Sequence, residues 1–127
     1  MDAGGAQPGD RGWSVDFTSA AAGNVVYAQA VCVVDPPDLA YEVVTVSTTT
    51  GAVGSTDSVL AVCPDGKRVL GGGYTSGSGS AVWRVWRNRP VDANGLFLGD
   101  RGWRADFTSA IPGSSVGVQA ICGVVSG

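Results

Sequence analysis

One passage of this 127-residue sequence occurs twice. The letters GDRGWSVDFTSAAAGNVVYAQAVCVV at 9–34 match GDRGWRADFTSAIPGSSVGVQAICGV at 99–124, with a constant offset of 99 − 9 = 90. A repeat unit of 90 residues is the size of one small domain, so the chain has room for one complete unit and a fragment. We therefore expect three parts: an N-terminal half-repeat at 1–34, equivalent to 91–124, a Pro-rich linker at 35–42, and a complete β-module at 43–127.

The residue types and their spacing predict strands rather than helices. Glu, Lys, Leu and Met are scarce, whereas Gly, Ser, Thr and Val are abundant, which is typical of short strands and tight turns. Strand-like runs between turn signals lie at Trp13–Phe17, Val25–Val34, Tyr41–Thr48, Ser58–Cys63, Arg68–Thr75, Ala81–Asn88, Trp103–Phe107 and Val116–Val125. We expect an all-β fold, an antiparallel β-sandwich or a small barrel of about eight strands.

Two glycine-containing stretches carry local predictions. CPDGK at 63–67 places Pro, Asp and Gly as a tight turn requires, so we expect the flanking strands to form a hairpin. No helical pattern follows GGG at 71–73, so this stretch is not a phosphate-binding loop. We interpret it as a strand bulge or a close backbone approach beneath a bulky neighbour.

The composition disfavours several classes of function. The sequence contains no histidine, which removes the commonest general base and most zinc sites. Its net charge of −3 disfavours nucleic acid as a partner, and no apolar run approaches the roughly 18 residues of a membrane-spanning helix. We expect no catalytic residue, no metal, no cofactor, no nucleic-acid partner and no membrane insertion.

The 3 cysteines leave one without an intrachain partner. Cys32 and Cys122 occupy equivalent positions of the repeat, so they compete for Cys63. We favour Cys63 with Cys122, because this pair keeps a complete module in unbroken chain order; Cys32 is then a free or intermolecular thiol. Two alternatives stay open: Cys32 bonds Cys63 in a permuted unit at 1–90, or all three are buried thiols in a reducing compartment.

The stretch AVWRVWRNR at 81–89 is chemically the most unusual. In a regular strand Arg84 and Trp86 share one face, and Trp83 and Arg87 share the other. An exposed indole stacks on sugar rings and Arg offers a fork of donors, so Trp83, Arg84, Trp86 and Arg87 are candidate ligand-binding residues. The structural alternative places one Trp in the core and the Arg side chains over aromatic rings.

The complete module also resembles a known type of exported protein. Along the chain it has VCPDGKRVLGGGY at 62–74, WRNRP at 86–90, GW at 102–103 and VQAICG at 118–123. This order resembles a β-rich repeat module of exported bacterial surface and appendage proteins, in which a Cys-Pro-x-Gly-Lys turn and a Leu-Gly-Gly-Gly strand precede a Trp strand and a closing Ala-x-Cys. The resemblance implies a surface or appendage part, and it brings no catalytic residues with it.

These observations favour a non-catalytic structural module, located outside the cell or on its surface. A truncated β-unit exposes apolar inner faces and strand edges, both of which promote association. We therefore expect the half-repeat to mediate self-association into a homo-oligomer or filament, as part of a surface array, fibre or appendage. The alternative is a carbohydrate- or receptor-binding module that uses 81–89, with a surface glycan as its partner.

Overall fold

A computed structural model describes residues 12–30, 32, 39–77 and 81–125. The first half of the linker expected at 35–42, residues 35–38, therefore lies outside the described residues. The chain divides into two units, 1–36 and 37–127, which are considered separately below. Among the described residues, no helix combines the length and the hydropathy needed to cross a membrane.

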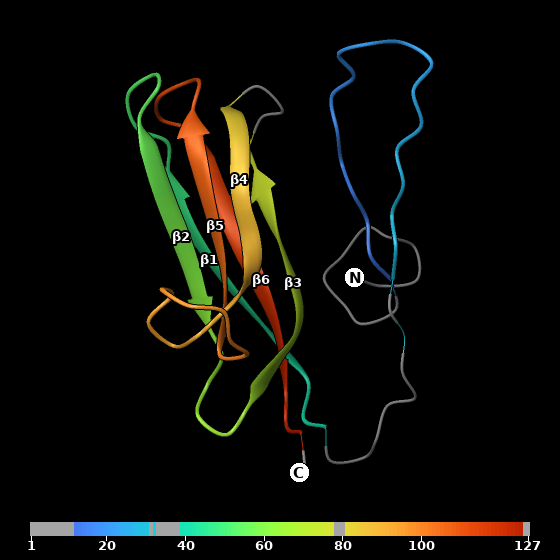
Figure 1. The fold of residues 1–127 in the computed structure, drawn as a ribbon, viewed down its shortest axis with the longest axis vertical. Coiled ribbons are helices and arrows are strands. Elements are labelled where there is room, and N and C mark those ends of the chain that lie inside the picture. The colour runs from blue at the N-terminus through green and yellow to red at the C-terminus, as the bar shows by residue number, and fades with distance from the viewer. Residues whose placement is uncertain (1–11, 31, 33–38, 78–80, 126–127) are drawn as a thin grey trace. The chain divides into compact units, whose positions relative to one another are not determined.

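The unit 37–127 is built from six antiparallel strands in two sheets (Figure 1). The strands are β1 (Glu42–Thr49), β2 (Thr56–Val62), β3 (Arg68–Ser76), β4 (Val82–Val91), β5 (Gly102–Ser109) and β6 (Ser115–Gly123). Sheet A has the order β1-β6-β3 and sheet B the order β2-β5-β4. The all-β prediction is confirmed, and two open sheets around one core are consistent with a β-sandwich rather than a barrel.

The two central strands, β5 and β6, supply most of the core. Along both strands the core side chains recur at every second residue, because successive side chains point to opposite faces of a sheet. The central residues of the core cluster are Val59, Ala61, Cys63, Ala105, Phe107, Val116, Val118, Ala120 and Cys122. The segment 99–124 therefore contributes the middle strand of each sheet and six of the nine buried core residues.

The prediction of eight strands was wrong for the half-repeat. The segments expected at Trp13–Phe17 and Val25–Val34 form no strand within 12–30 or at Cys32; the other residues of the second segment lie outside the described part. Their repeat equivalents in β5 and β6 form strands because each hydrogen-bonds to a neighbour on both sides. The unit 1–36 contains no sequence equivalent to β1–β4, so the same kind of segment has no ladder to join there.

The CPDGK stretch forms its turn but not the expected hairpin. Gly66 has a φ of 85°, and the Lys67 N–H donates to the Pro64 carbonyl at 3.1 Å. However, β2 enters this turn from sheet B and β3 leaves it into sheet A. The hairpin prediction was wrong because β2 pairs with β5 and β3 pairs with β6, so the turn connects the two sheets.

The GGG stretch has the close backbone approach and the bulge that its sequence suggested. A Cβ atom at Gly72 would lie 2.3 Å from Cδ2 of Trp103 and 2.6 Å from the carbonyl oxygen of Gln119. The indole of Trp103 therefore packs directly on the backbone of β3, where no side chain fits. A β-bulge between Val69 and Gly71 precedes this contact.

Candidate functional site

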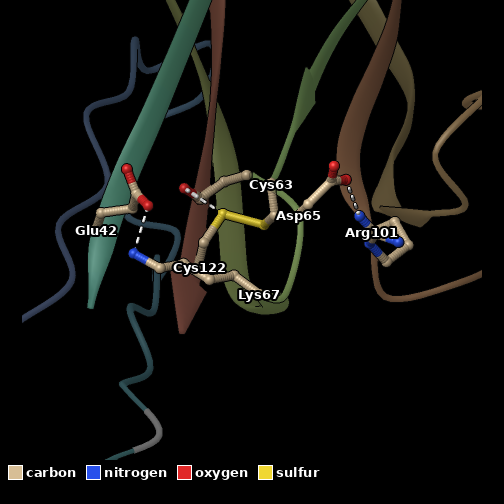
Figure 2. The surroundings of a disulfide bond; sticks show 7 residues. Glu42, Cys63, Asp65, Lys67, Arg101 and Cys122 are labelled. Atoms are coloured by element: carbon tan, nitrogen blue, oxygen red, sulfur yellow. Dashed lines mark hydrogen bonds and ion pairs between the residues drawn. A yellow bond between two sulfur atoms is a disulfide. The ribbon is translucent and has the colours of Figure 1, made fainter. Parts of the chain in front are cut away.

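A disulfide joins the two sheets at one end of the module. Cys63, just after β2, bonds Cys122 near the end of β6, 59 residues later (Figure 2). The ion pair between Lys67 and Glu42, 2.5 Å long, lies beside it. Cys32, the repeat equivalent of Cys122, is exposed and forms no disulfide.

The GDRG loop at 99–102 binds both ends of the turn between β2 and β3. The backbone N–H groups of Cys63 and Val69 donate to the carbonyls of Arg101 and Asp100, at 2.8 and 2.6 Å respectively. The two charged side chains of the loop also pair with the turn. These ion pairs are Asp100–Arg68 at 2.7 Å and Arg101–Asp65 at 3.5 Å (Figure 2 shows the second). The GDRG letters thus have a structural role, which is to hold the CPDGKR segment.

The Trp/Arg stretch lies on β4, but its side chains do not alternate as expected. Bulges between Val82 and Arg84 and between Val85 and Arg87 each insert one residue, which shifts the pattern. Both arginines consequently pair with outward-facing residues of β5, Thr108 and Asp106. The expectation that Arg84 and Arg87 lie on opposite faces was therefore wrong.

Both tryptophans of this stretch occupy the bulge positions and are exposed. Trp83 is 66% exposed and Trp86 is 44% exposed, so neither belongs to the core. The guanidinium carbon of Arg87 lies 5.6 Å from the centroid of the Trp86 ring, a cation–π contact. The structure therefore brings Trp86 and Arg87 together, whereas Trp83 stands apart from this pair.

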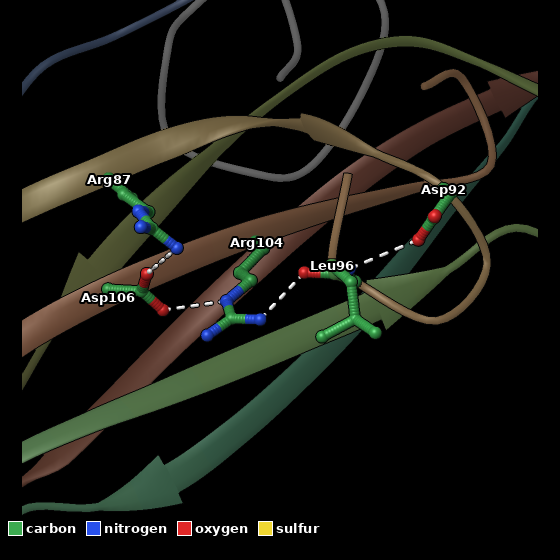
Figure 3. Close-up of polar contacts among 6 residues, drawn as sticks. Arg87, Asp92, Leu96, Arg104 and Asp106 are labelled. Carbon is green, nitrogen blue, oxygen red and sulfur yellow. Dashed lines mark hydrogen bonds and ion pairs between the residues drawn. The ribbon is translucent and has the colours of Figure 1, made fainter. Parts of the chain in front are cut away.

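A buried carboxylate organises the outer face of sheet B (Figure 3). Asp106 of β5 is only 2% exposed, although its neighbours in the strand, Ala105 and Phe107, point the other way into the core. Its Oδ1 accepts a hydrogen bond from Nε of Arg104 at 2.7 Å. Its Oδ2 lies 3.4 Å from Nη1 of Arg87 and, among the described residues, receives no hydrogen bond.

The carbonyl of Gly95 fixes the second arginine of this group. Nη1 of Arg104 donates to that oxygen at 2.6 Å, so the loop after β4 holds this arginine. This loop is itself ordered by Asp92, whose side chain accepts the N–H groups of Asn94 and Leu96 (Figure 3 shows the Leu96 bond). The guanidinium group of Arg104 is thereby held between a carboxylate and a carbonyl.

An open hollow of about 270 Å³ lies beside this carboxylate. It is lined by 56–58 of β2, by Trp86 and Arg87 of β4, and by Arg104 and Asp106 of β5. The carboxylate of Asp106, two guanidinium groups, two hydroxyls and one indole belong to this lining, whereas Asp57 has the register of the core residue Phe107. Sugars and peptides bind in such mixed surroundings, because donors, acceptors and an apolar ring lie within reach of one ligand.

Sequence reasoning found two residues of the hollow, Trp86 and Arg87, and missed those of β2 and β5. The alternation within RADF at 104–107 contained the necessary signal. If Phe107 is in the core, Arg104 and Asp106 must share the opposite face. Nothing in the local sequence indicates that β2 lies beside them, because this pairing spans the length of the module.

Within the described part of the chain, no three side chains are grouped so that they could hold a metal ion. No protein-family model, curated protein or solved structure matches this sequence.

Proposed function

We propose that this protein is a non-catalytic extracellular structural module that joins copies of itself into a surface array, fibre or appendage. Its half-repeat, 1–34, supplies the two central strands of a sandwich whose outer strands come from a neighbouring copy of the sequence 37–98. The segment 99–124 already fills the core of its own module in every copy. The half-repeat can therefore join the β1–β4 strands of a neighbouring copy only by exchanging with that copy's own 99–124, to which its sequence nearly corresponds.

The inner face of the half-repeat carries this proposal. The inward positions of β5 and β6 are Trp103, Ala105, Phe107, Ser109, Val116, Val118, Ala120 and Cys122. The half-repeat has Trp13, Val15, Phe17, Ser19, Val26, Ala28, Ala30 and Cys32 at these positions. Only two positions differ, and they differ reciprocally: Ala105 is replaced by a valine and Val118 by an alanine, so the total volume is unchanged.

The outer positions are less alike, which fits a selective constraint on the core. Arg104, Ser115 and Gly117 are replaced by Ser14, Val25 and Tyr27. A Cβ at Gly117 would lie 3.2 Å from Oγ1 of Thr75 and 3.3 Å from the backbone carbonyl oxygen of Val46, so a tyrosine there requires both neighbours to shift. The half-repeat thus keeps the inner positions of a sandwich more closely than the outer ones.

The GDRGW letters support the same conclusion. In the module this loop holds the CPDGKR turn with two backbone hydrogen bonds and two ion pairs, and Trp103 packs on Gly72. The half-repeat has the same five letters at 9–13. It therefore has the groups needed to bind a second CPDGKR turn and a second GGG strand.

Among the described residues of the half-repeat, Phe17 is 61% exposed and Val26 is 49% exposed, whereas their equivalents Phe107 and Val116 are fully buried in the module. Uncovered apolar faces associate in water. The Cys63–Cys122 disulfide supports the extracellular location, because such bonds persist in oxidising compartments.

The experiment is to supply the missing strands by placing a copy of 35–90 ahead of Met1, which corresponds to Val91. We expect the extended chain to be monomeric with two modules, to bond Cys32 to the added copy of Cys63, and to protect amides of 12–30 from hydrogen exchange. The original chain should associate as its concentration rises, and removal of 1–34 should abolish this.

A charge at Phe17 provides the matched control. Phe17→Asp places a charge on an exposed position of the original chain but in the core of the completed module. It should leave the original chain folded and prevent the added module from forming. The proposal fails if 12–30 stay unprotected in the extended chain while Cys32 remains a thiol.

A further inference from the structure

The hollow on the outer face of sheet B has a chemistry that the assembly role does not use. It lies on the face of sheet B that points away from the core. Its residues come from β2, β4 and β5 of the module itself, and none comes from the half-repeat. The half-repeat also has Ser14 where the hollow has Arg104, so this feature belongs to the complete module 37–127. We propose that the hollow binds a neutral, polyhydroxylated sugar ring, as found in a surface glycan.

The buried carboxylate is the first argument. Asp106 is 98% buried, yet its Oδ2 accepts no hydrogen bond from the described residues. A buried acceptor without a hydrogen bond is costly; its nearest donor is Nη1 of Arg87 at 3.4 Å, and Asp106 is one of the residues that line the hollow. A sugar hydroxyl is a suitable donor because it gives one hydrogen bond and still accepts others.

The donors around the carboxylate are the second argument. Arg87 is 43% exposed and offers its remaining N–H groups to the hollow. Arg104 uses Nε and Nη1 in its contacts with Asp106 and Gly95, which leaves Nη2 as a further donor. Adjacent ring hydroxyls present oxygens to such a pair, while their hydrogens can reach Asp106 and the hydroxyl of Ser58.

The pairing of the arginines favours a neutral ligand over an acidic one. Arg87 and Arg104 both contact the carboxylate of Asp106, whereas Asp57 lies opposite the core residue Phe107 in the register, so its carboxylate belongs to the other face of β2. An anionic sugar would have to compete with Asp106 for the two arginines and would be repelled by it. The volume of about 270 Å³ suits one ring, with its C–H face on the indole of Trp86.

The test is a titration of the intact protein with methyl hexosides, namely glucoside, galactoside and mannoside, and with methyl glucuronide as the acidic counterpart. Tryptophan fluorescence and backbone amide shifts report binding. We expect at least one neutral hexoside to bind saturably, with a dissociation constant on the order of a few millimolar for so small a ligand. The glucuronide should bind at least about tenfold more weakly.

The two exposed tryptophans of β4 provide a matched pair of variants. Trp86→Ala should weaken binding about tenfold or more without unfolding the protein, because this side chain is 44% exposed. Trp83→Ala removes the same side chain from the same strand, but Trp83 does not line the hollow, so binding should be unchanged. The proposal is overturned if no neutral hexoside binds, if the glucuronide binds more tightly, or if both variants lose binding equally. If removal of 1–34 abolished sugar binding, the site would not belong to the module 37–127, and the proposal would also be overturned. This measurement is independent of the assembly experiment, which measures association of the chain rather than sugar binding.

Discussion

Substituting Ala105→Val and Val118→Ala together should lower the free energy of unfolding by less than the sum of the losses from the two single substitutions. Both residues are fully buried and lie on the central strands of facing sheets. Trp103 packs on Gly72, the register partner of Ala120. Trp103 and Ala120 therefore lie at one level of the core. Ala105 follows Trp103 by two residues in β5, and Val118 precedes Ala120 by two residues in β6, so Ala105 and Val118 also lie at one level. The double variant reproduces the inner face of the half-repeat.

The magnitudes follow from the burial of each side chain. Val118→Ala removes two carbons, worth about 1.6 kcal/mol of transfer free energy, and the cavity raises the loss to about 2–3 kcal/mol. Ala105→Val inserts two carbons into a filled core and costs about 1–3 kcal/mol. If the added volume fills the cavity, the double variant recovers about 2 kcal/mol, which is typical of residues in contact.

Urea unfolding followed by tryptophan fluorescence, with the disulfide intact, measures all the free energies of unfolding. Ala61→Val is the matched control, because Ala61 is equally buried but lies beside Trp103 in sheet B. Combined with Val118→Ala it should give an additive loss. If the losses from Ala105→Val and Val118→Ala also add within about 0.5 kcal/mol, the side chains of the half-repeat do not compensate one another in this core, and the reasoning is refuted.

Three further changes test the architecture. Gly72→Ala should cost about 3 kcal/mol or more in urea unfolding, because its Cβ would lie 2.3 Å from Trp103. Gly71→Ala should be nearly neutral, since its Cβ meets nothing closer than 3.8 Å; equal losses would contradict the packing described. Reduction of the disulfide, which closes a separation of 59 residues, should lower the free energy of unfolding by about 4 kcal/mol on the loop-entropy estimate, and an unchanged urea midpoint would show that it is dispensable. Arg104→Ala should cost about 3–5 kcal/mol because it leaves Asp106 buried with one distant partner; a loss below about 1 kcal/mol would mean that solvent reaches the carboxylate.

The sequence by itself determined the features that depend on neighbouring residues. Gly66 sits at the positive φ of the turn that CPDGK predicts, because turn geometry depends on a few consecutive residues. The alternation in WRADF puts Phe107 on the same face as Ala105, since side chains in a strand have a period of two, and both residues are in the core. The all-β class followed in the same way from the abundance of Gly, Ser, Thr and Val.

Only the tertiary structure decided which strands form and where they pair. GWRADFTS at 102–109 is the central strand β5, whereas the nearly identical GWSVDFTS at 12–19 is not a strand. The bulges at Trp83 and Trp86 likewise arise from pairing with β5, and β2 and β3 join different sheets despite their short connection. The physical reason is that a strand is completed by hydrogen bonds to distant segments, so its own letters specify a face and a shape but not the presence of a partner.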